Sequence, residues 1–223
     1  LASATSAGSN TAIGWNAAYA VTTGTTAITA IGDGAYNGAG DAETHNMAIG
    51  VNAMAAGSLA GAEYNVAIGN YALDAITSGD KNTCIGYDAG GALTSGSENT
   101  IIGENAGSNA AITGDANTIV GKIAGYALTS GHSNTIIGRH AMSATTTGNQ
   151  NTAVGYGALD AMVDQADATC VGYNAGVANT AAETTAFGSE AAAGNTSGGA
   201  ITAIGNEAYK NADTENHNIA IGF

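Results

Sequence analysis

Apolar and polar positions follow one short pattern that returns thirteen times along this chain. The pattern reads Asn-Thr-Ile-Ile-Gly at residues 99–103 and Asn-Thr-Ile-Val-Gly at 117–121. Its last residue, the repeat glycine, recurs at intervals of 16–19 residues. The thirteen repeat glycines are Gly14, Gly32, Gly50, Gly69, Gly86, Gly103, Gly121, Gly138, Gly155, Gly172, Gly188, Gly205 and Gly222. This period predicts an all-β parallel β-solenoid of about 13 coils that forms a single repeat domain over residues 1–223.

The two positions before the repeat glycine are apolar in every copy. Isoleucine, valine and threonine favour an extended strand, and neighbouring residues of a strand point to opposite faces. One face can line the thin lumen of the coil, but the other needs a cover, which we expect to be further copies of the chain. Ile101, Ile119 and Ile136, where the usual alanine or cysteine becomes isoleucine, are predicted to lie in this oligomer interface.

Further positions predict how each coil turns. An alanine stands three residues after each of the first twelve repeat glycines, which indicates close packing inside the coil. Beyond it we expect a second strand with solvent-facing polar positions such as Asp74, Ser108 and Lys210. The glycines of the return turns, Gly79 to Gly148, are expected to supply a positive φ. Asparagine stands four residues before nine repeat glycines, where side-chain amides can hydrogen-bond from coil to coil.

The phrase Asn-Thr-Ala-Ile-Gly-x-x-Ala occurs at residues 10–17 and, with valine for isoleucine, at 151–158. It resembles the head repeat of YadA-like trimeric autotransporter adhesins. It is also similar to repeats of phage tail-fibre proteins that trimerise through a C-terminal intramolecular chaperone, and this is the better likeness. The resemblance covers essentially the whole chain. It implies a left-handed parallel β-roll, a homotrimer, and an extracellular role as an adhesive head or shaft.

Charge narrows the range of partners. The chain has four fixed cations, Lys81, Lys122, Arg139 and Lys210, against 18 acidic residues, which gives a net charge of −14. A nucleic-acid partner is not expected, because phosphate binding relies on clustered basic side chains. No run of residues approaches the ~18 apolar residues of a membrane helix, so no membrane insertion is expected.

The sequence offers little chemistry for catalysis. The four histidines lack Cys, Asp or Glu partners at metal-ligand spacing, and no nucleophile, phosphate-loop or paired-carboxylate motif is present. Cys84 and Cys170 occupy the same repeat position five coils apart, which excludes a disulfide and favours buried thiols. We therefore expect no enzyme, no metal and no cofactor. Ice binding by a threonine row is disfavoured, because these threonines are expected on a buried strand, one to a coil.

The position after the repeat glycine lies on a turn and varies most in residue type. Four successive coils place Lys122, Arg139, Tyr156 and Tyr173 there, and we predict that they stack in one column. Two cations beside two tyrosines favour a shallow platform for an anionic glycan, which would stack on the rings and pair with the cations. The plainer interpretation is that these are tolerated turn residues, since exposed aromatic side chains are common.

Two functional hypotheses follow. The first is a trimeric shaft or adhesive segment of a phage tail fibre or surface adhesin, which binds a cell-surface glycan or protein receptor. The second is a self-assembling extracellular filament, whose protomers stack head to tail. For the second, joining Phe223 to Leu1 would continue the repeat with a gap of 1 + 14 = 15 residues between repeat glycines.

Overall fold

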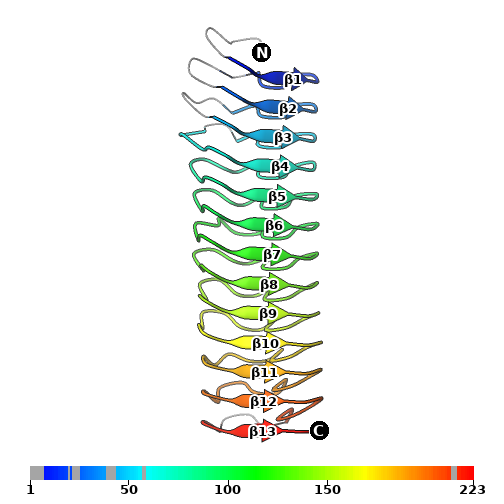
Figure 1. Ribbon diagram of the computed structural model, residues 1–223, viewed down its shortest axis with the longest axis vertical. Coiled ribbons are helices and arrows are strands. Elements are labelled where there is room, and N and C mark those ends of the chain that lie inside the picture. The colour runs from blue at the N-terminus through cyan, green and yellow to red at the C-terminus, as the bar shows by residue number, and fades with distance from the viewer. Residues whose placement is uncertain (1–7, 20, 22–25, 39–43, 57–58, 212–214) are drawn as a thin grey trace. The chain divides into compact units, whose positions relative to one another are not determined.

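The structure, a computed structural model, describes residues 8–19, 21, 26–38, 44–56, 59–211 and 215–223. It contains thirteen strands of three residues, arranged in one parallel sheet in chain order (Figure 1). The strands are β1 (Thr11–Ile13), β2 (Thr29–Ile31), β3 (Met47–Ile49), β4 (Val66–Ile68), β5 (Thr83–Ile85), β6 (Thr100–Ile102), β7 (Thr118–Val120), β8 (Thr135–Ile137), β9 (Thr152–Val154), β10 (Thr169–Val171), β11 (Thr185–Phe187), β12 (Thr202–Ile204) and β13 (Ile219–Ile221). This confirms the predicted all-β parallel solenoid with a repeat of 16–19 residues.

The chain divides into two compact units, Leu1–Asp115 with β1–β6 and Ala116–Phe223 with β7–β13. The solenoid pattern is the same in both. The single domain over residues 1–223, the left hand of the roll and the trimer stay predictions. Leu1, which the head-to-tail hypothesis joins to Phe223, lies outside the described residues.

Within each unit, neighbouring strands pair in register, so that equivalent repeat positions lie on one another. Thr83 pairs with Thr100 in the first unit, and Thr118 pairs with Thr135 in the second. The repeat glycine bonds each coil to the one before it. Its N–H donates to the carbonyl of the residue that precedes the previous repeat glycine. The N···O distance is 2.7 Å from Gly155 to the carbonyl of Ile137. Each repeat position therefore forms a column with a spacing of about 4.8 Å.

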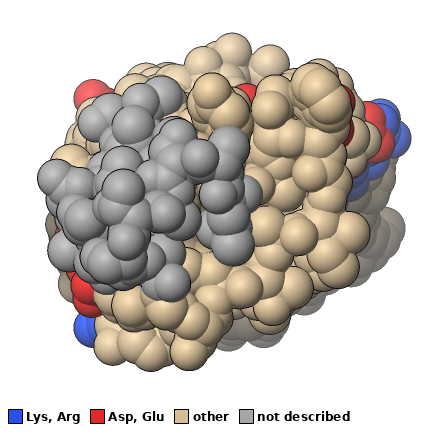
Figure 2. Space-filling model, turned by 90° about the horizontal axis from the view of Figure 1, so that it is seen from above, with Lys and Arg blue, Asp and Glu red and all other residues tan. Residues whose placement is uncertain are grey.

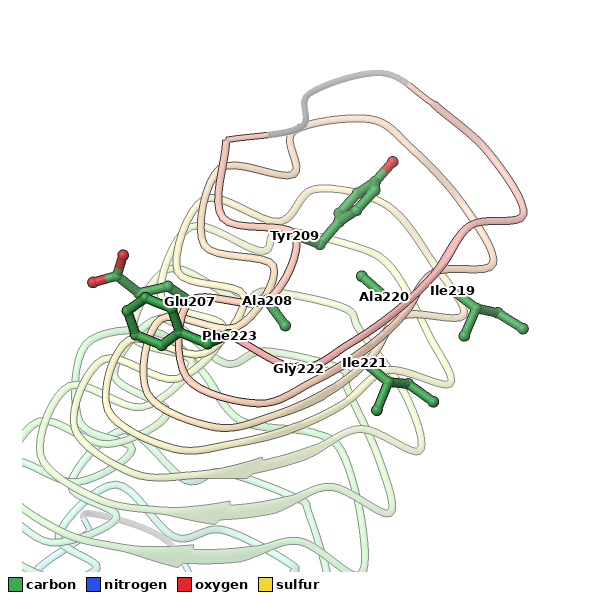
Figure 3. A pocket seen from close by; sticks show the side chains of 8 residues that line it. All are labelled: Glu207, Ala208, Tyr209, Ile219, Ala220, Ile221, Gly222 and Phe223. Carbon is green, nitrogen blue, oxygen red and sulfur yellow. The ribbon is translucent and has the colours of Figure 1, made fainter.

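The three side chains of a strand alternate between the lumen and the outside. The middle residue is fully buried, with 0% exposure, in every strand from β2 to β12. The first and third residues are partly or fully exposed in all thirteen strands. Figure 3 shows this alternation in β13, where Ile219 and Ile221 point to one side and Ala220 points to the other.

This alternation corrects the interface prediction for Ile101, Ile119 and Ile136, which are buried middle residues of β6, β7 and β8. Each fills space in the lumen. A methyl group added at Gly107 would lie 3.4 Å from Cδ1 of Ile101, and one added at Gly125 would lie 3.2 Å from Cδ1 of Ile119 and 3.3 Å from Cδ1 of Ile136. The isoleucines thus occupy room that these glycines leave across the coil, as close packing requires. They belong to the core of a single chain.

The asparagine ladder is confirmed in both units. In the first unit, the Asn82 N–H donates to Oδ1 of Asn65 at 2.9 Å, and its Nδ2 donates to the same oxygen at 3.1 Å and to the Gly96 carbonyl at 2.9 Å. In the second unit, the Asn151 N–H and Nδ2 donate to Oδ1 of Asn134 at 2.9 and 3.2 Å. Each buried amide is bonded to the next coil and to the return turn, so the ladder satisfies polar groups that burial would otherwise penalise.

The turns differ from expectation in one respect. The alanine after each repeat glycine is buried where described, and its N–H turns back to that glycine, as from Ala158 to the Gly155 carbonyl at 3.4 Å. The chain beyond it forms no second strand within the described residues, but only turns, bends and isolated bridges such as that between Leu93 and Ile112. Asp74, which was expected on this second strand, lies on a turn instead and is partly exposed.

The glycines of the return turns also have a different purpose from the predicted one. Gly79 and Gly131 do not adopt a positive φ; a Cβ at either site would overlap a carbonyl oxygen, of Gly96 and Gly148 respectively. The left-handed conformation falls two residues later, on Lys81 with φ 57° in the first of these turns. These glycines are therefore required by the close approach of the next coil.

Replacing Gly138 by alanine is expected to destabilise the second unit strongly. Gly138 has a φ of 135°, and a Cβ there would lie 2.6 Å from the carbonyl carbon of Gly155. Backbone strain and steric overlap together are expected to cost about 3 kcal/mol or more, measured by urea unfolding. In the control Gly199→Ala, the new methyl group meets no atom closer than 3.6 Å and needs no positive φ. Equal unfolding midpoints for the two variants would contradict this prediction.

Candidate binding site

The second unit brings three of the predicted column residues into contact. Cζ of Arg139 lies 5.8 Å from the ring centroid of Tyr156. Tyr156 stacks on Tyr173, with 5.5 Å between the centroids and 17° between the planes. The tyrosines are 45% and 52% exposed. Lys122 is exposed at the same repeat position of the coil before Arg139. The predicted column is thus present as a geometric arrangement, and its role in binding stays a prediction.

His140 extends this cluster and was not among the predicted binding residues. Its ring lies 6.1 Å from that of Tyr156, tilted by 57°, and it is partly exposed. The available signal was its position beside Arg139, one residue further along the same turn.

The stack determines which ring surface is open to a ligand. Arg139 lies in the coil before Tyr156, and Tyr173 lies in the coil after it, so both faces of the Tyr156 ring are occupied. Cation–π contact of this exposed kind is worth about 0.5–1 kcal/mol. The cluster offers a cationic end at Lys122 and Arg139, the edge of Tyr156, and one ring face of Tyr173.

A second surface is the outward face of the strands. It consists of the first strand residue, threonine in ten strands, and the third, which is isoleucine, valine or phenylalanine. Ile137, Phe187 and Ile204 are 38%, 43% and 41% exposed. The first strand residue was predicted to be buried; alternation places it outside instead. The structure records no hydrogen bond from the hydroxyl groups of the strand threonines to any described residue.

No charged residue occupies this outward face in any of the thirteen strands. Figure 2 looks onto one end of the molecule, where acidic and basic side chains are visible near the edge of the view; the outward strand face is not seen from this side. For a chain with 18 acidic residues, a continuous uncharged face is a pronounced segregation. Such an uncharged, partly apolar surface indicates contact with a partner molecule and not with solvent alone.

Acidic side chains gather on the turns of the first unit. The Asp88 carboxylate extends over Gly91, where an added Cβ would overlap its Oδ1. The pKa of Asp74 is raised to about 6, chiefly by burial and also by the negative charge of Asp88, while a backbone hydrogen bond acts in the opposite direction. Burial also raises the pKa of Asp88, opposed by a hydrogen bond with Ser108. Two neighbouring carboxylates thus resist full ionisation.

The two cysteines have no site chemistry. Cys84 and Cys170 are free and buried as middle strand residues, as predicted. Burial raises the pKa of Cys84 well above its ordinary value and that of Cys170 to about 12. The thiolate is the reactive form, so both thiols are inert.

Other features of the described residues add no second site. They contain no group of three or more His, Cys, Asp or Glu side chains arranged to hold a metal ion, and no helix suited to crossing a membrane. Figure 3 shows a pocket at the last coil, lined by Glu207, Ala208, Tyr209 and residues 219–223. It is the open side of β13 and the turn facing it.

Comparisons with known proteins return nothing: no family model, no curated protein and no solved structure matches this chain. Functional inference therefore depends on the geometry above and on the resemblance of the repeat phrase.

The raised pKa of Asp74 leads us to expect that the free energy of unfolding depends on pH. The folded chain holds the Asp74 proton more tightly than the unfolded chain, whose pKa is near 3.8, so ionised Asp74 disfavours folding above about pH 6. This penalty fades as the pH falls through 6 towards 3.8. Asp74→Asn is expected to stabilise the protein at pH 7.5 by about 1 kcal/mol, a value reduced for solvent screening.

Urea unfolding at several pH values measures this effect. The gain from Asp74→Asn should be nearly constant above about pH 6.5 and shrink as the pH falls through 6 to 4.5. The comparison variant Asp33→Asn changes an exposed aspartate on a turn of the same unit and separates a general effect of removing a negative charge from the effect of position 74. A gain that is constant with pH would rule out Asp74 as its source.

Proposed function

We propose that this chain is a non-enzymatic fibre segment: a homotrimeric, extracellular shaft or adhesive segment of a phage tail fibre or surface adhesin, which binds a cell-surface glycan or protein receptor. The observation that carries the proposal is the outward strand face, which is uncharged in all thirteen strands and lined by aliphatic side chains and threonine hydroxyls. The trimer and the extracellular location rest on the resemblance of the repeat phrase.

A second copy of the chain suits this face better than an unrelated protein does. A partner must cover one branched side chain and one hydroxyl group in nearly every coil, at the spacing of parallel strands, about 4.8 Å. Another copy has that same spacing along its length. Its own face is also uncharged, so contact between two chains of net charge −14 is least repulsive there.

Ile137→Asp tests this assembly. Ile137 is 38% exposed on the outward face, so an aspartate there would place a charge between copies. Light scattering should show an oligomer for the unchanged protein and monomers for the variant, with the β-sheet circular dichroism retained in both. Val163→Asp is the matched control, because Val163 is 45% exposed in a connecting segment of the same unit, outside the strands; it should remain oligomeric.

A second control separates assembly from folding. Ile136→Ala changes the neighbouring residue, which faces the lumen, and should lower stability by about 2–5 kcal/mol without dissociating the oligomer. A monomeric unchanged protein, or an Ile137→Asp variant that assembles normally, would contradict the proposed fibre.

Binding is proposed for the column of the second unit. An acidic glycan would pair with Lys122 and Arg139 and contact the exposed tyrosines. The double variant Arg139→Ala, Tyr156→Ala should reduce binding to acidic glycans on an array roughly tenfold, because it removes a charge pair and a ring. Unchanged array binding by intact oligomers would eliminate the column as the site.

The absence of enzymatic activity is part of the proposal. The intervals between repeat glycines stay at 16–19 residues, which leaves no insertion large enough to build a cleft with catalytic groups. The filament hypothesis uses the same coil but a different contact, end to end. Negative-stain images distinguish the two, since a tail-fibre or adhesin segment gives short rods of uniform length and the filament gives long unbranched fibres.

Ice binding is a second candidate function, favoured by one observation. The hydroxyls of six successive strand threonines, from Thr118 to Thr202, lie outside at regular spacing with no recorded partner in the described chain. This removes the objection that the threonines are buried. Ice binding requires that the outward strand face be exposed to solvent. Thermal hysteresis from a monomeric protein would therefore support ice binding, and stable trimers without hysteresis would exclude it.

A further inference from the structure

The aromatic column of the second unit ends abruptly. The position after the repeat glycine holds Arg139, Tyr156 and Tyr173 in three successive coils, and these three side chains stack on one another. The next coil has Ser189 at this position, and the one after it has Asn206. The column therefore loses a large side chain at Ser189 while the backbone ladder continues past it.

The gap beside Ser189 has the height of a flat ring. Two coils separate Tyr173 from Asn206, roughly 9.6 Å of backbone at the spacing of parallel strands. A ring that contacts atoms on both of its faces needs about 7–8 Å between them. The backbone fixes this height, because the Glu190 N–H donates to the Tyr173 carbonyl at 2.7 Å and the Glu207 N–H donates to the Ser189 carbonyl at 2.8 Å.

Tyr173 presents its open ring face to this gap. Its other face is packed on Tyr156, and the ring is 52% exposed. Stacking on Tyr156, which is itself packed under Arg139, holds the ring in place before any ligand arrives. A preorganised ring reduces the entropy lost on binding.

The polar groups around the gap suit a sugar. The Ser189 hydroxyl and the Asn206 amide can donate and accept hydrogen bonds, and the Asn206 side chain has no recorded partner among the described residues. The C–H face of a pyranose can pack on the tyrosine ring while its hydroxyl groups bond at the rim.

The charge nearby favours a neutral sugar. The residues after Ser189 and Asn206 are Glu190 and Glu207, and Lys210 forms ion pairs with both. Its Nζ lies 3.2 Å from Oε1 of Glu207. Two carboxylates and one ammonium leave a net negative charge, which disfavours an acidic sugar at this end of the column.

We propose that Tyr173, Ser189 and Asn206 form a binding position for a neutral pyranose, which takes the place of the missing large side chain in the column. This rests on the proposed function, in which the fibre binds a cell-surface glycan, and it names the sugar class and the position. It is distinct from the cationic end at Arg139.

The first unit provides a matched control. Tyr87 occupies the same repeat position and is 53% exposed. Its neighbour Tyr71 meets it edge-on, at 75° and 5.8 Å. The following coil has Glu104 where the second unit has Ser189. Tyr87 therefore has the exposure of Tyr173 without the stacked support or the small residue that opens the gap.

The test uses the full chain on an array of neutral and acidic glycans, with bound sugars confirmed by titration of the free oligosaccharide. The unchanged protein should bind neutral pyranosides. Ser189→Tyr fills the gap, and Tyr173→Ala removes the ring; each should weaken this binding roughly tenfold or more. Tyr87→Ala should bind as the unchanged protein does. Circular dichroism and the melting temperature establish that each variant is folded.

Two outcomes would overturn the inference: no neutral glycan bound by the unchanged protein, or neutral binding that survives both Ser189→Tyr and Tyr173→Ala in folded variants. Binding confined to acidic glycans and lost in Arg139→Ala would place the ligand at the cationic end instead. Light scattering on the same samples distinguishes failure of the sugar-binding position from failure of the proposed fibre. Trimers without neutral-glycan binding would refute this position alone, and a monomeric chain would refute the proposed fibre.

Discussion

The in-register hydrogen bonding between successive coils is the constraint on which the rest of this structure depends. Within each unit, every repeat glycine after the first donates its N–H to the coil before it. A Cβ at Gly155 would lie 2.6 Å from the carbonyl carbon of Gly172, so the backbones approach too closely there for any other residue. This contact requires glycine at a fixed interval and sets the spacing of every column, from the buried asparagines to the exposed tyrosines.

The strand alternation then divides the residues of each coil into two environments. Inside, a narrow lumen demands constant volume, so larger middle residues such as Ile119 face a glycine such as Gly125. Outside, aliphatic and threonine side chains form a face without charge. An aliphatic or aromatic residue retained at the third strand position in all thirteen strands is more readily explained by contact with a partner than by contact with water. The function proposed above follows from this outward face, because the described lumen residues are apolar side chains, hydrogen-bonded asparagines and buried thiols, all inaccessible to a partner.

The sequence alone was sufficient for features that depend on period. The spacing of the glycines located all thirteen strands, and the stacking of equal positions correctly placed Arg139, Tyr156 and Tyr173 in contact. It was insufficient where two neighbouring positions look alike. Both residues before the repeat glycine are apolar, so composition did not reveal which one lines the lumen, and Ile136 was assigned to the wrong face. Short turns also escaped prediction, since glycine serves equally for positive φ and for close approach, and at Gly131 only the latter applies.

The central claim is that the outward strand face is covered by other copies of the chain, and a spin label on that face tests it most directly. Cys84 and Cys170 are buried, so a nitroxide reacts selectively with Ile137→Cys or with the control Val163→Cys, which lies outside the strands. In assembled protein, the label at position 137 is predicted to be immobile and broadened by labels on neighbouring copies, and the broadening should disappear when labelled chains are diluted with unlabelled ones before assembly. A label at position 137 that is mobile and magnetically isolated within an assembled particle would contradict the account.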